Sequence, residues 1–178
     1  MAESTLIFGD EQHLIATLTP PEAGSPAPTW VAVLTNSGVI PRMGPHRINV
    51  RLARQFSKAG IPSIRFDLSG LGDSRRATGN RPVVEQWVED TRMAMDVAER
   101  QWGAVKFFMV GLCSGAEVAR TTPRRSRRAA PCVHPLPATA PSVTTRARSA
   151  VLLVTGSGAA SPVLTASTGG SGTATPRA

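Results

Sequence analysis

Three short apolar runs, separated by helical segments, constrain the fold of this chain more than any other feature. Each has the length and residue types of a β-strand, and together they occupy residues 30–35, 63–66 and 106–110. Between them, residues 45–59 and 82–102 repeat apolar side chains at helical spacing. Strands alternating with helices predict an α/β fold, with a mostly parallel sheet flanked by helices. An apolar hairpin over residues 5–19 is expected to add antiparallel strands at one edge.

The composition changes abruptly near residue 118. Up to residue 117 the twelve basic and twelve acidic side chains balance, whereas residues 118–178 hold eight Arg and no acid. Val and Leu supply only ten of those 61 residues, and Phe and Ile are absent, which is below the roughly 20% expected of a chain that buries a core. We therefore divide the chain into part of an α/β domain, residues 1–119, and a disordered tail rich in Arg, Pro, Ala and Thr, residues 120–178.

Two interpretations of this tail are open. Its residue types are those that a GC-rich gene encodes in the wrong reading frame, and the break falls within an expected helix. The alternative is a genuine low-complexity segment. The apolar run 151–156 has the pattern of a strand, and we interpret that pattern as chance.

Charge, cysteine content and hydropathy exclude several classes of function. The formal net charge of +8 comes from the tail, and the Arg cluster at 124–128 has no aromatic side chain for base stacking, so we do not expect a nucleic-acid partner. Two cysteines make no disulfide framework, and no cluster of residues has metal-ligand spacing. No apolar run is long enough for a membrane span, and the N-terminus has no basic signal region. We expect a cytoplasmic protein without a membrane, metal or cofactor requirement.

The segment Gly111-Leu112-Cys113-Ser114-Gly115 carries the clearest chemistry, because it has the form Gly-x-nucleophile-x-Gly between a strand and a helix. A sharp turn there exposes the central side chain, and the helix N-terminus favours an anion such as a thiolate. The N–H of Ser114 is placed to stabilise an oxyanion. A buried structural cysteine in a tight turn is the alternative, and Ser114 is a second, off-centre nucleophile candidate.

Two further loops follow predicted strands and belong at the same sheet edge. Thr35-Asn36-Ser37-Gly38 follows the first strand, and Asp67-x-Ser69-Gly70-x-Gly72-x-Ser74 follows the second. In parallel sheets, ligands bind beyond the carboxyl ends of the strands. With the cysteine motif, these loops make residues 31–119 resemble the N-terminal half of an α/β-hydrolase, in the serine-aminopeptidase-like or lysophospholipase-like branch. Cys113 replaces the usual Ser, and Ser69 replaces the usual Arg.

The resemblance implies acyl transfer from a small ester, thioester or peptide substrate through a covalent intermediate. It implies that Cys113 is the nucleophile and that the oxyanion is held by backbone N–H groups of Ser114 and of Asn36, Ser37 or Gly38. It also implies a site-shaping loop made by Asp67, Gly70, Gly72 and Ser74, in which Asp67, Asp73 and Ser74 hydrogen-bond to backbone. The resemblance says nothing about the oligomeric state.

The departure from this family lies after the nucleophile, where the triad acid and then the histidine are expected. The last acid is Glu117, one helical turn past Cys113, and the one downstream histidine is His134, in a Pro-rich run. His13 and His46 are expected to be structural, His13 with no partner in view. We therefore expect an incomplete, inactive hydrolase chain. The alternative is a non-catalytic α/β interaction module with a basic disordered tail.

Overall fold

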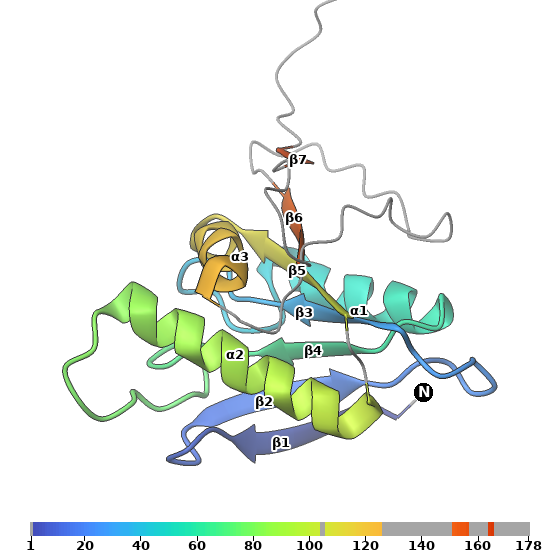
Figure 1. Ribbon diagram of the computed structural model, residues 1–178, viewed down its shortest axis with the longest axis horizontal. Coiled ribbons are helices and arrows are strands. Elements are labelled where there is room, and N and C mark those ends of the chain that lie inside the picture. The colour runs from blue at the N-terminus through green and yellow to red at the C-terminus, as the bar shows by residue number, and fades with distance from the viewer. Residues whose placement is uncertain (1, 104–105, 126–150, 157–163, 166–178) are drawn as a thin grey trace, which may run out of the picture.

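The computed structural model describes residues 2–103, 106–125, 151–156 and 164–165 (Figure 1). Its helices are α1 (Ile48–Lys58), α2 (Val83–Trp102) and α3 (Ser114–Arg125), and a short 3-10 turn, η1 (Pro45–Arg47), precedes α1. Its strands are β1 (Ser4–Phe8), β2 (Leu14–Thr19), β3 (Trp30–Leu34), β4 (Ser63–Phe66), β5 (Lys106–Leu112), β6 (Val151–Gly156) and β7 (Leu164–Thr165).

The strands form one mixed sheet in the order β1-β2-β4-β3-β5-β6-β7. At its centre β3 pairs in parallel with β4 and with β5, so that Val33 lies opposite Ile64 on one side and Met109 on the other. The hairpin β1–β2 joins β4 antiparallel, and β6 joins β5 antiparallel. The predicted α/β architecture and the edge hairpin are confirmed, with the parallel pairings confined to the centre of the sheet.

Helices cover both faces of the sheet, as Figure 1 shows. The side chains of β3 alternate between two cores with the period of two that a strand imposes. Val31 and Val33 pack in the cluster that contains residues of α2 and α3, whereas Ala32 and Leu34 pack with Leu52 and Phe56 of α1. Burial of each large apolar side chain contributes about 1.5–3 kcal/mol. This burial on both faces fixes β3, β4 and β5, the strands that carry the three candidate loops.

Two predicted boundaries are wrong. The helix expected over 45–59 becomes α-helical only at Ile48, because the φ angles of His46 (49°) and Arg47 (58°) are left-handed and interrupt the helical path. The strand expected over 106–110 continues through Gly111 to Leu112. The turn that was expected over residues 111–116 therefore shrinks to a single residue between β5 and α3.

The region interpreted as a tail is described only in part. Helix α3 continues to Arg125, beyond the predicted boundary at residue 119. Residues 151–156, interpreted above as a chance pattern, form β6, so that interpretation is wrong. His134, Cys132 and the Arg cluster past residue 125 lie outside the described residues, and neither interpretation of the tail's origin is tested. No helix in the described ranges is both long enough and apolar enough to cross a membrane.

Candidate active site

The connection between β5 and α3 consists of Cys113 alone. β5 ends at Leu112, α3 begins at Ser114, and the φ of Cys113 is 55°, in a region that residues other than glycine rarely adopt. Its thiol is free and its side chain is exposed. Backbone strain of this kind persists only where the surroundings enforce it, and it is concentrated at functional sites. The turn thus presents a thiol at the N-terminal end of α3, where helix N–H groups lack intrahelical partners.

Two glycines allow this turn by letting backbone segments approach closely. A Cβ on Gly111 would lie 2.3 Å from the carbonyl oxygen of Gly115, and a Cβ on Gly115 would lie 2.1 Å from that of Asn36. Both distances are far below any real contact. The first turn of α3 can therefore rest against both β5 and the loop after β3 only with glycine at these two positions.

The loop after β3 is hydrogen-bonded to the same turn. The Gly38 N–H donates to Ser114 Oγ at 3.0 Å, and Thr35 Oγ1 donates to the Gly115 carbonyl oxygen at 3.2 Å. These two bonds join a loop and a helix that are more than 70 residues apart in the chain. The loop that follows β3 and the turn at Cys113 consequently form one structural unit.

The four residues predicted to line an oxyanion site are brought together, and the Gly38 N–H and the Asn36 side chain hold the loop in place through hydrogen bonds. The Gly38 N–H is occupied by Ser114 Oγ. The Asn36 side chain is fully buried and holds the loop, donating to the Ile40 carbonyl oxygen at 2.9 Å and accepting from the Leu68 N–H at 2.8 Å. Ser37 is 7% exposed, between these two anchored neighbours. The Ser114 N–H lies in the first turn of α3.

Asp67 organises the loop after β4. Its fully buried carboxylate accepts hydrogen bonds from Asn36 Nδ2 at 3.0 Å, from the Asp73 N–H at 3.1 Å, and from both the backbone and the guanidinium of Arg42. A Cβ on Gly72 would lie 2.4 Å from the Asp67 carboxyl carbon, so this approach also needs glycine. The carboxylate joins the loops after β3 and β4.

The remaining residues of the predicted site-shaping loop bond to backbone groups. Ser74 Oγ donates to the Asp67 carbonyl oxygen at 2.6 Å and accepts from the Ile15 N–H at 2.9 Å. The Gly70 N–H donates to the Arg75 carbonyl oxygen at 3.3 Å. The loop is thereby tied to β2 as well as to itself.

Arg42 supplies the positive charge beside Asp67. Its Nη1 lies 2.7 Å from the Asp73 carboxylate and also pairs with Asp67. Partial burial by itself lowers the pKa of the guanidinium, but the hydrogen bonds to Asp73 and Asp67 outweigh it and raise the pKa above its ordinary value. Arg42 therefore stays charged at neutral pH.

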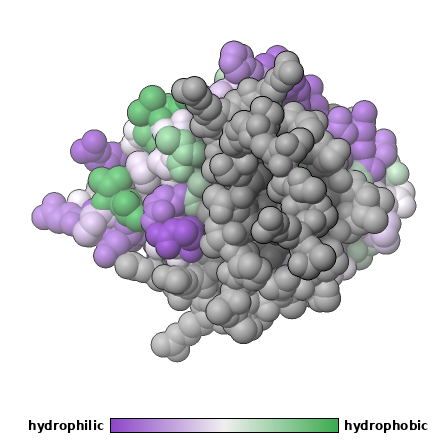
Figure 2. All heavy atoms as spheres, turned by 90° about the horizontal axis from the view of Figure 1, so that it is seen from above, coloured by the Kyte–Doolittle hydropathy of each residue, from purple (hydrophilic) through white to green (hydrophobic). Residues whose placement is uncertain are grey.

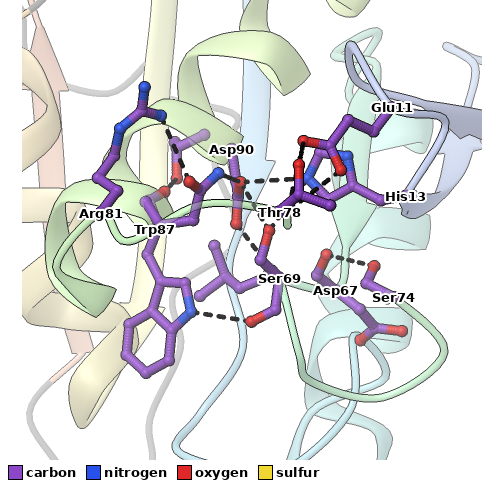
Figure 3. Close-up of polar contacts among 12 residues, drawn as sticks. Glu11, His13, Asp67, Ser69, Ser74, Thr78, Arg81, Trp87 and Asp90 are labelled. Atoms are coloured by element: carbon purple, nitrogen blue, oxygen red, sulfur yellow. Dashed lines mark hydrogen bonds and ion pairs between the residues drawn. The ribbon is translucent and has the colours of Figure 1, made fainter. Parts of the chain in front are cut away.

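A buried cluster beneath the loop was missed by the sequence analysis (Figure 3). His13 Nε2 lies 3.1 Å from Ser69 Oγ, and Ser69 donates to Asp90 of α2 through both its hydroxyl (2.9 Å) and its N–H (2.7 Å). His13, expected to have no partner, thus packs at 3% exposure against a serine 56 residues away. The sequence held no signal for this cluster, because His13 lies in a hairpin, Ser69 in a loop and Asp90 in a helix, and the three segments are far apart in the chain.

The arrangement of these three side chains indicates a structural role, although their residue types are those of a catalytic triad. In a triad, the histidine stands between serine and carboxylate and uses its two nitrogens for them. Here the same nitrogen of His13 faces both, at 3.1 Å from Ser69 and 3.8 Å from Asp90, and the serine hydroxyl donates directly to the carboxylate. The three side chains join the hairpin, the loop and α2.

No histidine within residues 2–103 or 106–122 hydrogen-bonds to Cys113. His46 is exposed in η1, and Glu117 pairs with Arg120 on α3 at the protein surface. Hydrogen bonding to Arg120 lowers the pKa of Glu117. Across the described side chains, no group of three or more His, Cys, Asp or Glu is arranged to hold a metal ion.

Apolar side chains project from the loop after β3. Val39, next to the anchored Gly38, is 81% exposed, and Ile40 and Met43 of the same loop are also exposed. Figure 2 shows hydrophobic side chains at the surface beside strongly hydrophilic ones. A cavity of about 580 Å³ lies elsewhere, lined by residues of α1 and the N-terminus, and none of the three loops contributes to it. Val39, Ile40 and Met43 thus give the loop after β3 an exposed apolar surface.

Comparison with known families gives one match over most of the chain. The family described as Serine aminopeptidase, S33, matches residues 39–170. This range begins just after Gly38, and it includes the loop after β4 and the turn at Cys113. No curated protein matches the chain.

Solved structures share the fold at low sequence identity. A serine hydrolase homologue from Coxiella burnetii is 18% identical (TM-score 0.54), and the match covers 67% of this chain and 56% of that one. A lidless serine hydrolase from Xanthomonas campestris is 21% identical (TM-score 0.54), covering 69% and 55%. A putative hydrolase of unknown function from Agrobacterium tumefaciens is 19% identical (TM-score 0.56), with the same coverage. These matches confirm the predicted α/β-hydrolase fold, and the chain spans little more than half the length of these relatives.

Proposed function

Because the chain belongs to the serine aminopeptidase family of α/β-hydrolases, we propose that it performs acyl transfer with Cys113 as the nucleophile. The observation that carries this proposal is the turn itself: an exposed thiol, on a residue with a left-handed φ, between a central strand and the N-terminus of a helix. A cysteine kept only for packing needs neither exposure nor a strained backbone.

The reaction proceeds by attack of the Cys113 thiolate on the carbonyl carbon of an ester, thioester or amide. A C–S bond forms, the carbonyl oxygen takes the negative charge, and the leaving group departs with its electron pair and gains a proton. Water then attacks the acyl-thioester, releases the acid and restores the thiol. Apolar side chains of Val39, Ile40 and Met43 offer the acyl group a surface near the thiol, since Val39 adjoins the Gly38–Ser114 hydrogen bond.

The oxyanion is stabilised by the N–H of Ser114 and by a donor of the loop after β3 other than the Gly38 N–H, which Ser114 Oγ occupies. An oxyanion donor lowers the barrier by about 3–4 kcal/mol when it is already oriented. The tight packing at Gly111 and Gly115 and the hydrogen bonds from Gly38 and Thr35 provide this orientation. No reorganisation of the loop is required at the moment of attack.

The inactivity expected from the sequence then concerns turnover: we expect this chain to become acylated faster than it hydrolyses the acyl group. Deacylation in this fold uses a histidine oriented by an acid. After Cys113 the sequence has one histidine, His134, and one acid, Glu117, and Glu117 is engaged by Arg120. The predicted behaviour is stoichiometric acylation with slow turnover.

The test uses 4-nitrophenyl acetate and follows release of 4-nitrophenolate. The expected result is a burst of one equivalent followed by a slow phase. The burst disappears in Cys113→Ala and persists in Cys132→Ala, which removes the other cysteine of the chain and serves as the matched control. A wild-type protein without a burst, or a burst retained in Cys113→Ala, overturns the proposal and leaves the non-catalytic α/β module as the better interpretation.

A further inference from the structure

One buried hydroxyl on the loop after β3 has no hydrogen-bond partner. Five buried side-chain atoms in the described part of the chain share this property: His13 Nδ1, Thr19 Oγ1, Ser37 Oγ, Ser63 Oγ and Arg65 Nε. Buried polar groups are nearly always hydrogen-bonded, and an exception calls for a specific explanation. Of the five atoms, Ser37 Oγ is the one that belongs to the loop joined to the turn at Cys113.

The backbone around Ser37 is held on both sides. Its own carbonyl oxygen accepts the Ile40 N–H at 3.1 Å. The preceding Asn36 is anchored through its side chain to Ile40 and Asp67, and the following Gly38 is anchored to Ser114 at 3.0 Å. Ser37 therefore cannot leave the turn at Cys113, while its hydroxyl can rotate about χ1 without breaking a hydrogen bond.

The Gly38 N–H, an expected oxyanion donor on this side of the site, already has Ser114 Oγ as its acceptor. The loop consequently lacks that backbone donor in the ligand-free protein. The neighbouring Ser37 hydroxyl is a donor that the described part of the protein leaves without an acceptor. The anchored backbone holds Ser37 next to Gly38, whose N–H bonds to Ser114, the residue that follows Cys113.

We propose that the Ser37 hydroxyl, which is buried in the protein alone, turns about χ1 and donates a hydrogen bond to the carbonyl oxygen of the acyl substrate as that oxygen becomes an oxyanion. The inference rests on the proposed function and adds a side-chain donor to it. Ser37 keeps its proton throughout and forms no covalent bond. Its partner is the substrate, which accounts for its lack of a partner in the protein alone.

The test compares two reactions of the same thiol in Ser37→Ala. Acetylation by 4-nitrophenyl acetate creates an oxyanion, whereas alkylation by iodoacetamide displaces iodide and creates none. We expect the acetylation rate of Cys113 to fall about a hundredfold and the alkylation rate to stay at the wild-type value. Ser37→Thr, which retains a hydroxyl, is expected to restore most of the acetylation rate.

Ser63→Ala is the matched control, because it also removes a buried hydroxyl without a partner, but at the start of β4, the opposite end of the strand from the site. It should change neither rate. Since Ser37 Oγ has no bond to lose, the melting temperature of Ser37→Ala should match or exceed that of the wild type.

Three results overturn the inference: an unchanged acetylation rate in Ser37→Ala, an equal fall in acetylation and alkylation, or a melting temperature well below that of Ser63→Ala. The last two would show that Ser37 holds the turn rather than the oxyanion. A wild-type Cys113 that is alkylated but never acetylated refutes the proposed function itself, and this result is distinct from the other three.

Discussion

Replacement of Asp67 by alanine tests whether one buried carboxylate holds the candidate site together. The substitution removes the acceptor for Asn36 Nδ2, the Asp73 N–H and both donors of Arg42. Asn36 retains the Ile40 carbonyl oxygen and the Arg42 guanidinium retains Asp73. The two backbone N–H groups are left without the carboxylate.

The magnitude follows from these losses. A buried donor left unpaired costs about 1–3 kcal/mol, and the N–H groups of Arg42 and Asp73, which are only partly buried, lie at the lower end of that range. Two such donors, and the charge of Arg42 without its buried partner, place the loss of unfolding free energy near 3–5 kcal/mol, the range for breaking a buried ion pair. Asp73→Ala removes the other carboxylate from the same guanidinium, but Asp73 is 69% exposed. Its loss should cost less than about 1 kcal/mol.

The assay is urea unfolding of both variants and the wild type, followed by fluorescence of the three tryptophans and analysed by linear extrapolation. Alkylation of Cys113 by iodoacetamide reports on the site in the same samples. We expect only Asp67→Ala to lower the unfolding midpoint strongly and to alter the alkylation rate. Both carboxylates contact the Arg42 guanidinium, and we attribute the larger contribution of Asp67 to its burial. Equal losses of unfolding free energy in Asp67→Ala and Asp73→Ala would refute this attribution.

Two further predictions concern packing and pH. Gly115→Ala forces a Cβ into the carbonyl oxygen of the loop after β3, so the free energy of unfolding should fall by about 1–3 kcal/mol in urea titrations; an unchanged midpoint contradicts the packing of α3. The side-chain and backbone hydrogen bonds of Thr78 lower the pKa of Glu11, so their stabilisation is present above the unfolded-state pKa and is lost as the pH falls through the folded-state value. The melting temperature of Thr78→Val should therefore be lower than that of the wild type at neutral pH and equal to it in acid. A difference in melting temperature that persists in acid contradicts the stabilisation of ionised Glu11 by Thr78.

The architecture could be predicted because it depends on local patterns. The runs that became β3, β4 and β5 are short, apolar and separated by helices, and the motif around Cys113 places glycine wherever the backbone approaches closely. The extent of β5 was missed, since Gly111 reads as a turn residue but is needed inside the strand for contact with Gly115. The start of α1 was missed because two residues without glycine's freedom, His46 and Arg47, adopt left-handed φ values.

The contacts that connect the loops could not be predicted, because they join side chains distant in sequence. Asn36 was expected to offer only its N–H, yet its side chain bonds to Asp67, 31 residues away. His13 meets Ser69 across 56 residues, and no pattern in either segment marks the pairing. Long-range polar pairs of this kind follow from the packing of the sheet, which local periodicity does not encode.

Peptide mapping of the protein after reaction with 4-nitrophenyl acetate tests the central claim most directly. If Cys113 is the nucleophile, the acetyl group is found on the peptide that contains Cys113, as a thioester that hydroxylamine removes. The Cys132 peptide then remains unmodified. An acetyl group found only as stable amides on lysine, or equally on both cysteines, would contradict the claim that the turn between β5 and α3 makes this thiol a nucleophile for acyl transfer.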